Sequence, residues 1–229
     1  MQYKDTFSLL TRYVRSSSIL GSTMEMRTSL VKHHFQEFKR GGHFSVGYHP
    51  IKHTDHYKAA LLFAITRILK PAVVVETGVA SGHSSLGILA ALELNRKGHL
   101  YSIDKPNAEY ITDSGTVWSD LTDRGVGWLV PVELRPRWTL RLGHSAEQLP
   151  RLINGLDHVD LFYHDSEHTL VNMLFELETC WSKMATGGVI VADNINWNSA
   201  FYEFCSSKRI PHSVLFPFVG ITRKRCLPQ

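Results

Sequence analysis

The feature that most constrains the fold of this sequence is a regular alternation of short apolar runs and helix-like segments that begins near residue 72. The runs are AVVVE (72–76), LYSID (100–104), TLRLG (139–143), VDLFYH (159–164) and VIVAD (189–193). Their length is typical of buried strands, and apolar residues at helical spacing separate most of them. Strands that alternate with helices form parallel sheets, so the sequence predicts a doubly wound α/β fold.

The expected helices cover about 54–69, 83–95, 169–184 and 198–207, and another begins at about 145. The last two strand-like pieces, SVLF (213–216) and VGITR (219–223), predict a closing hairpin. A length of 229 residues suits one such domain with a modest extension.

Two parts of the chain do not follow the alternation. Residues 1–53 combine helical spacing with a glycine-rich stretch, GGHFSVGYHP, and predict an N-terminal helical extension or lid before an α/β domain over 54–229. Residues 105–137 are rich in Pro, Gly, Trp and charge, which indicates an insertion that could act as a substrate lid.

Composition excludes some classes of protein. The formal net charge of +4 permits a nucleic-acid partner but does not require one. The cysteines Cys180, Cys205 and Cys226 form no CxxC pair, which favours reduced thiols over disulfides or a thiolate zinc site. No apolar run approaches the length of a membrane span and the N-terminus lacks the apolar core of a signal peptide, so a cytoplasmic protein without a membrane partner is expected.

The stretch VVVETGVASGHSS (73–85) joins the first strand to a helix through a glycine loop. Gly78 and Gly82 allow the backbone to turn sharply and approach a ligand, and Glu76 ends the strand beside them. The loop is not the GxGxxG of nicotinamide enzymes, because Ala80 takes the middle position, and no GK[ST] of a P-loop follows. An acidic strand end suits a ligand with cationic character; an ordinary strand–helix turn is the alternative.

Five segments in order, ETGVASGHSS, YSID, RLGHSAEQLP, FYHDSEHT and GGVIVADNINW, resemble the motif series of class I S-adenosylmethionine (SAM)-dependent methyltransferases. The resemblance extends from about residue 71 to the end of the chain. It is greatest to metal-dependent catechol-type O-methyltransferases and to bacterial O-methyltransferases of sugars and natural products. It implies a seven-stranded, mostly parallel Rossmann-like sheet flanked by helices, with SAM as cofactor and a role in natural-product biosynthesis.

The resemblance also assigns cofactor-binding positions. The loop around the methionine part of SAM is matched by Glu76, Gly78, Ser81, Gly82 and Ser84. Asp104 matches the acid that holds the ribose hydroxyls, while His144 and Ser145 match the turn beside adenine. The sequence departs from many relatives at Ala80, where they have glycine.

Oxygen-bearing side chains end two strands that we expect to be neighbours. Asp165 follows the fourth strand, and Asp193 and Asn194 follow the fifth. Carboxylate and carboxamide oxygens are hard ligands that suit Mg²⁺ or Mn²⁺, and the matching set in catechol-type enzymes binds the metal. The alternative is that these acids only cap loops and helices.

His168 lies three residues after Asp165 and is the candidate general base. A hydroxyl that attacks a methyl sulfonium must lose its proton, and an imidazole with a pKa near neutrality can accept it. His168 could instead be a helix residue bonded to Asp165 or Glu167. His164 is expected to pack beneath the site.

Two other classes are less consistent with the sequence. Thirteen histidines invite a zinc site, but His53 and His56 have no obvious third and fourth ligand. Tryptophans and arginines in 105–137 could stack on nucleobases, yet HDSEH stands where methyltransferases acting on base amines carry an NPPY-like segment. No nucleic-acid partner is therefore expected.

The sequence thus predicts an enzyme that moves a methyl group from SAM to a hydroxyl of a small molecule (sugar, catechol or natural product) with a divalent metal, Mg²⁺ or Mn²⁺. Asp165 and His168 are the predicted catalytic residues. Two alternatives remain open: a metal-independent N- or C-methyltransferase, and a non-catalytic, cofactor-binding partner subunit. A homodimer is plausible in each case.

Overall fold

A computed structural model describes residues 53–106, 109–110, 118–119, 125–215 and 218–225. The predicted N-terminal extension lies outside these residues, as does Cys226. The domain boundary near residue 53 therefore stays a prediction.

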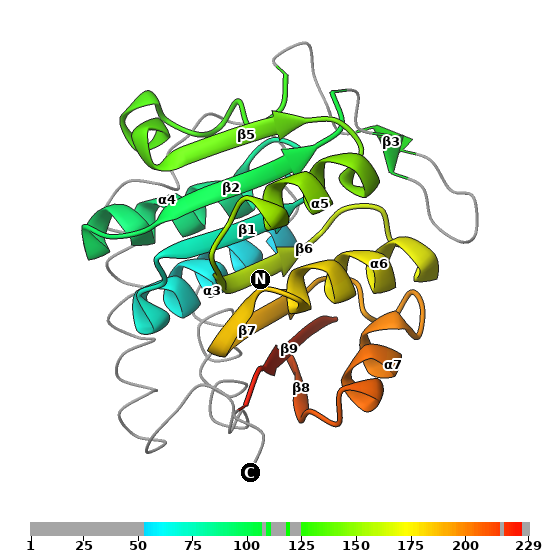
Figure 1. Ribbon diagram of the computed structural model, residues 1–229. Coiled ribbons are helices and arrows are strands. Elements are labelled where there is room, and N and C mark those ends of the chain that lie inside the picture. The colour runs from blue at the N-terminus through cyan, green and yellow to red at the C-terminus, as the bar shows by residue number, and fades with distance from the viewer. Residues whose placement is uncertain (1–52, 107–108, 111–117, 120–124, 216–217, 226–229) are drawn as a thin grey trace.

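Within the described residues, a seven-stranded sheet forms the centre of the molecule, in the order β5-β2-β1-β6-β7-β9-β8 (Figure 1). Its strands are β1 (Val73–Thr77), β2 (His99–Asp104), β5 (Trp138–Leu142), β6 (Val159–His164), β7 (Met184–Ala192), β8 (His212–Leu215) and β9 (Val219–Arg223). The first five in sequence order pair in parallel, whereas β9 runs antiparallel to both β7 and β8. The predicted mostly parallel sheet with a closing hairpin is confirmed.

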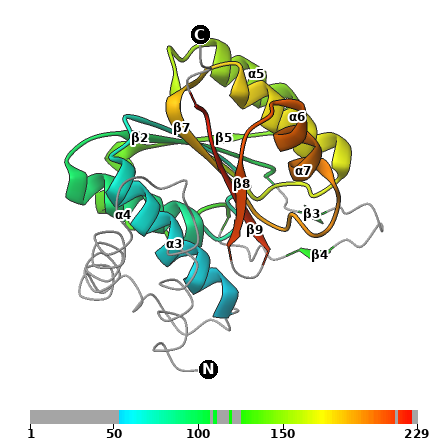
Figure 2. The ribbon, with the colours of Figure 1, turned by 90° about the horizontal axis from the view of Figure 1, so that it is seen from below.

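Helices cover both faces of the sheet, as the view from below shows (Figure 2). One face carries α3 (His53–Leu69) and α4 (His83–Asn95). The other carries α5 (Ser145–Asn154), α6 (Leu170–Trp181) and α7 (Ala200–Ser207). Two separate clusters of buried apolar side chains, one on each face, hold these three layers together.

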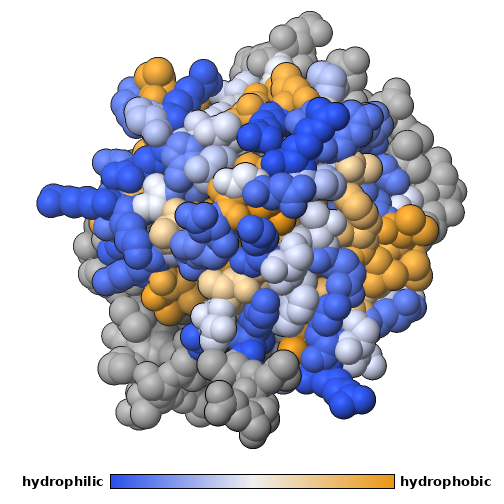
Figure 3. Space-filling view, viewed as in Figure 1, coloured by the Kyte–Doolittle hydropathy of each residue, from blue (hydrophilic) through white to orange (hydrophobic). Residues whose placement is uncertain are grey.

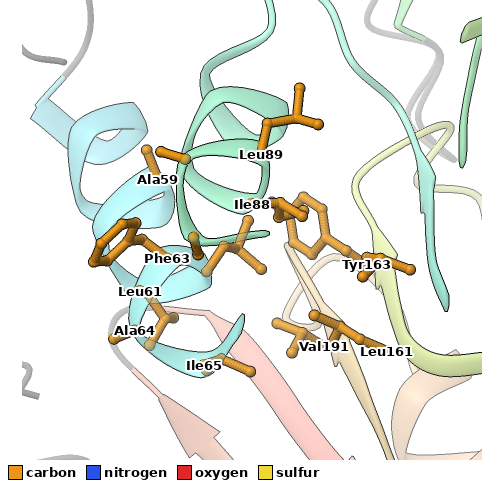
Figure 4. Packing of buried hydrophobic residues seen from close by; sticks show 14 of the residues in the cluster. Ala59, Leu61, Phe63, Ala64, Ile65, Ile88, Leu89, Leu161, Tyr163 and Val191 are labelled. Carbon is orange, nitrogen blue, oxygen red and sulfur yellow. The ribbon is translucent and has the colours of Figure 1, made fainter. Parts of the chain in front are cut away.

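The core between α3, α4 and the sheet is close-packed (Figure 4). Phe63 of α3, Ile88 of α4 and Tyr163 of β6 are buried in the same cluster, and Ile88 lies beside Tyr163. The two helices approach so closely that a Cβ on Gly87 would lie 2.2 Å from the carbonyl oxygen of Ala59. This packing fixes α3 against the sheet, which matters because α3 also supplies a side chain to the candidate site.

The structure differs from the sequence prediction in two places. β7 begins at Met184 rather than at residue 189, and α6 ends at Trp181. The predicted insertion, 105–137, contains the short antiparallel pair β3 (Glu109–Tyr110) and β4 (Trp118–Ser119), followed by a 3-10 helix, Val132–Arg137. Val130 and Leu134 join the core beside α4, so this segment is in part core as well as a candidate lid.

The face seen in Figure 1 is mostly hydrophilic, with smaller apolar patches between the polar side chains (Figure 3). No described helix has the length and apolar character needed to cross a bilayer.

Candidate active site at the carboxyl edge of the sheet

The carboxyl ends of four neighbouring parallel strands lie at one edge of the sheet. In the order β2, β1, β6 and β7, these strands end at Asp104, Thr77, His164 and Ala192. Open α/β sheets bind ligands beyond this edge. The residues that follow each strand therefore define the candidate site.

The glycine loop after β1 is held in place by the carboxylate of Asp104. Its Oδ2 accepts the backbone amides of Val79 (2.9 Å) and Ala80 (2.6 Å). Gly78 and Gly82 adopt positive φ values of 84° and 99°, a region that glycine enters without a steric penalty. The predicted loop is thus a tight turn, and Asp104 positions its backbone.

The other oxygen of Asp104, Oδ1, accepts the amide of Lys105 at 2.7 Å. Burial raises the pKa of this carboxyl, and the three backbone amides oppose the shift. Asp104, the side chain predicted to hold ribose hydroxyls, therefore lies at the expected strand end. It also accepts hydrogen bonds from three backbone amides.

Part of the predicted insertion lies directly against the glycine loop. The amide of Gly127 donates to the carbonyl of Ala80 (2.8 Å), and that of Leu129 donates to the carbonyl of Ser81 (3.0 Å). The Ser81 hydroxyl also bonds Nδ1 of His83 at 2.9 Å. Residues 127–129 therefore flank the glycine loop.

Glu76 is fully buried at the base of the loop. Its Oε2 accepts hydrogen bonds from Ser85 (2.6 Å) and Ser102 (2.7 Å), and Ser84 also stabilises the carboxylate. Its Oε1 is buried and has no hydrogen-bond partner among the described residues. Burial raises the pKa of Glu76 to about 7 despite the serine hydroxyls.

This raised pKa predicts a pH-dependent free energy of unfolding. Because the unfolded value is 4.5, the folded protein holds the Glu76 proton more tightly, and stability falls as the pH rises from 4.5 through about 7. The side chain of Glu76→Gln carries no charge at any pH. Relative to this variant, the free energy of unfolding of the wild type should therefore fall by about 3 kcal/mol across this pH range. Urea unfolding at a series of pH values measures the difference, and a difference that does not change with pH would contradict the prediction.

The predicted adenine-side residues begin α5 after β5. His144 occupies the N-cap position and is exposed, whereas the Ser145 hydroxyl donates to Oδ1 of Asn172 at 3.2 Å. Ser145 therefore connects this turn to α6. The structure places both residues at the carboxyl edge, near Asp104, whose carbonyl accepts the amide of Gly143 (2.8 Å).

The two predicted metal-binding acids lie close together, and Lys58 of α3 joins them. Its ammonium nitrogen lies 3.4 Å from Oδ2 of Asp165 and forms an ion pair with Oδ2 of Asp193. Asp193 is almost fully buried, and burial together with the charge of Asp165 raises its pKa to about 6. Tyr163 donates its hydroxyl to Oδ2 of Asp165 at 2.8 Å.

Asn194, the third predicted ligand, is a direct neighbour of these acids. Its φ of 53° is unusual for a residue other than glycine, although asparagine tolerates it better than most. With its amide nitrogen turned toward Asp193, it donates to Oδ2 of that residue at 2.7 Å. Asn194 thus lies beside the acid pair and braces Asp193.

Among the described residues, no three His, Cys, Asp or Glu side chains form a group able to hold a metal. The predicted set contains two acids and a carboxamide, so it is a weaker candidate than a three-acid site. The two carboxylates do fit a hard cation, since their donors are oxygens and since an ammonium group already lies between them. Asn194 would join them as a ligand only after turning its amide oxygen toward the site.

His168 lies over the acid pair and is 5% exposed. Its Nε2 is 3.6 Å from Oδ1 of Asp165, and its ring makes an edge contact with Trp197 at 4.9 Å between centroids. Burial, followed by the nearby His164, lowers the pKa of His168 to about 3. The imidazole is therefore neutral at pH 7, the form that can accept a proton.

A buried polar network beneath the site was not predicted from the sequence. Glu176 of α6 accepts from Thr77 (2.5 Å) and Ser166 (2.7 Å), and its Oε2 lies 2.6 Å from Nδ1 of His164. Burial raises the pKa of Glu176, but His164 and the hydroxyl donors outweigh this and lower it to about 2. The sequence signal that could have revealed this network is Glu176 itself. This acid follows the buried Met173 by three residues and so lies on the apolar face of α6.

This network fixes the loop that carries Asp165. Ser166 bonds Glu176, and the backbone amide of Asp165 donates to the carbonyl of Thr77 at 2.8 Å. His164 packs beneath the site as predicted, with its ring edge against His168. Glu176 therefore acts on the site through its neighbours.

The fold and this edge together define a class I methyltransferase type of domain: a parallel sheet closed by an antiparallel β9, a glycine loop after β1 and an acid ending β2. The sequence model of a family described as "Methyltransferase domain" matches residues 75–195. The chain belongs to this family of methyltransferase domains, and the prediction of a methyltransferase is confirmed.

Solved structures of methyltransferases share this fold. An O-methyltransferase from Bacillus cereus, in complex with SAH, has 16% identity and a TM-score of 0.53, covering 96% of this chain and 99% of that one. The calicheamicin methyltransferase CalS11 has 17% identity and a TM-score of 0.57, covering 96% and 91%. TomG from Streptomyces achromogenes, an O-methyltransferase of tomaymycin synthesis in complex with SAM, has 13% identity and a TM-score of 0.54, covering 99% and 100%. No curated protein sequence matches the chain.

Proposed function

We propose that this protein transfers a methyl group from SAM to a hydroxyl of a small molecule, assisted by a divalent cation. One observation carries the proposal: a pair of carboxylates and a neutral imidazole follow β6 and β7 at the edge where β1 presents its glycine loop. Methyl transfer to oxygen needs a methyl donor beside a polar group that can remove a proton.

The glycine loop and its surroundings suit SAM. The buried, unpartnered Oε1 of Glu76 fits the cationic methionine end of the cofactor, beside Gly78 and Gly82 and the serines Ser81 and Ser84. Oδ1 of Asp104 accepts the Lys105 amide and, with two lone pairs, can also accept a ribose hydroxyl. His144 and Ser145 would border adenine. Bound SAM supplies an electrophilic methyl group on a sulfonium.

On the acceptor side, Asp165, Asp193 and Asn194 would hold Mg²⁺ or Mn²⁺ through their side-chain oxygens. A divalent cation supplies charge that lowers the pKa of the acceptor hydroxyl and orients it. His168 then takes the hydroxyl proton at a ring nitrogen, and the adjacent carboxylate of Asp165 stabilises the imidazolium.

The acceptor we propose is a hydroxylated small molecule such as a sugar, a catechol or a natural product. CalS11 is described as a TDP-rhamnose 3'-O-methyltransferase of calicheamicin biosynthesis and TomG as an O-methyltransferase of tomaymycin synthesis. Exposed Trp197, which contacts His168, could line the acceptor side, whereas Phe201 of α7 is fully buried in the core. Cytoplasmic localisation and a homodimer remain predictions.

One observation favours a second candidate, a metal-independent methyltransferase. Lys58 already places a cation between Asp165 and Asp193, and this ammonium could neutralise the acids without a metal. Activity would then be independent of Mg²⁺, and the acids would serve to orient Lys58.

Methyl transfer from labelled SAM to a panel of sugars, catechols and phenolic natural products tests the proposal. The measurement is made with Mg²⁺ and with excess chelator. O-methylated product that forms with Mg²⁺ and disappears with chelator is the expected result. Full activity in chelator would reject the metal and support the second candidate, and transfer only to nitrogen or carbon acceptors would reject O-methylation.

A further inference from the structure

In the described structure, the ammonium group of Lys58 provides a positive charge beside the carboxylates of Asp165 and Asp193. It comes from α3, on the face of the sheet opposite α6, and it contacts the same atom type, Oδ2, of both Asp165 and Asp193. Nothing in the sequence around Lys58 indicates this contact. Its side chain is 22% exposed, like that of Asp165 at 21%, whereas that of Asp193 is 4% exposed, so Lys58 reaches from the solvent-accessible side of the site to the buried acid.

A lysine and a divalent cation compete at such a position. The ammonium donates hydrogen bonds to the carboxylate oxygens that a metal would need as ligands. It also repels a second cation placed a few ångströms away. The two cations therefore exclude each other unless the lysine side chain withdraws.

Withdrawal of Lys58 is physically feasible. The lysine side chain carries its charge on a flexible four-carbon stem, and this one is partly exposed. Asp193, in contrast, is confined by burial and by Asn194. The acids would stay in place while the ammonium moves out to water.

We propose that Lys58 is a built-in counter-cation that occupies the acid pair when no metal is bound and must be displaced for a divalent cation to bind. This inference rests on the proposed function, because it assumes that Asp165 and Asp193 hold a metal in the active protein. Lys58 then neutralises the charge of the two close carboxylates in the metal-free protein. Because it competes for the same oxygens, it also lowers the affinity of the site for the divalent cation. A buried or half-buried acid pair left without a cation would destabilise the fold.

The test is calorimetric titration of the full chain with MgCl₂, for wild type and Lys58→Met. Removing the competing charge should raise the Mg²⁺ affinity by about tenfold or more. In chelator the variant should melt at a lower temperature than wild type, and saturating Mg²⁺ should raise its melting temperature by more than that of wild type. Lys58→Gln is the second variant if Lys58→Met does not fold, because its amide retains a hydrogen bond to the acids.

Lys208→Met is the matched control. Lys208 is 28% exposed and pairs with Glu178 at 2.6 Å, between α6 and α7 and outside the candidate site. It should leave the Mg²⁺ affinity unchanged. Equal or weaker Mg²⁺ binding in both Lys58 variants would overturn the inference while leaving the metal-assisted function intact. If neither wild type nor the Lys58 variants bind Mg²⁺ or Mn²⁺, the metal part of the proposed function fails, and the inference fails with it.

Discussion

Replacing Asp165 with asparagine is expected to lower kcat for methyl transfer by about 10²–10³-fold. The substitution keeps the shape of the side chain but removes the charge that would attract a divalent cation and stabilise a protonated His168. SAM should still bind, because the glycine loop is held by Asp104 and by backbone hydrogen bonds. The loss should therefore fall on the chemical step.

Steady-state kinetics and SAM titration of the same variant separate the two effects. Glu178→Gln, an exposed change on the neighbouring helix α6, is the control and should keep wild-type kcat. A kcat within a few-fold of wild type for Asp165→Asn would remove this residue from the proposed chemistry. Loss of SAM binding would instead indicate that the glycine loop had been disturbed.

Gly78→Ala is expected to destabilise the protein by about 4 kcal/mol. The residue has φ +84°, and a Cβ there would lie 2.0 Å from the backbone carbonyl oxygen of Asp165. Backbone atoms cannot move aside as the end of a flexible side chain can. The neighbouring strands β1 and β6 would therefore have to separate at their carboxyl ends. This is also the point where the glycine loop meets the acid pair.

Gly125→Ala gives a matched control in the same chain. Gly125 has a similar φ of +78°, but no atom of the described residues lies within 4 Å of a Cβ at that position. Its substitution therefore reports the strain of the left-handed backbone alone, about 1 kcal/mol. Denaturant unfolding of both variants measures the difference, and equal destabilisation would show that contact between Gly78 and Asp165 is unimportant.

The strands of the sheet, but not their order, could be predicted from the sequence because most of them are short apolar runs with a polar end. VDLFYH and VIVAD are examples: they are buried in β6 and β7, and their final residues lead directly into Asp165 and Asp193. The beginning of β7 was missed because TGG at 186–188 looks like a turn. In the structure Gly187, with φ +84°, and Gly188 continue the strand beside a register shift between Val159 and Leu161.

The parts of the site that could not be predicted depend on contacts between distant residues. In the sequence, Lys58 is indistinguishable from any other polar residue on a helix. Its ammonium group reaches the acids because α3 packs on α4. Asp104 was expected to face a ligand alone, yet it also binds two amides of the glycine loop. Strand ends are visible in a sequence, whereas tertiary partners of single polar side chains are not.

The central claim is that one edge of this sheet binds both SAM and a divalent cation at Asp165. The most direct test is calorimetric titration of wild type and Asp165→Asn with SAM and with MgCl₂, before and after addition of chelator. We expect both proteins to bind SAM, and we expect a separate Mg²⁺ site to be present in wild type and lost in the variant. Binding of SAM without any Mg²⁺ site would contradict the metal, and absence of SAM binding would contradict the account as a whole.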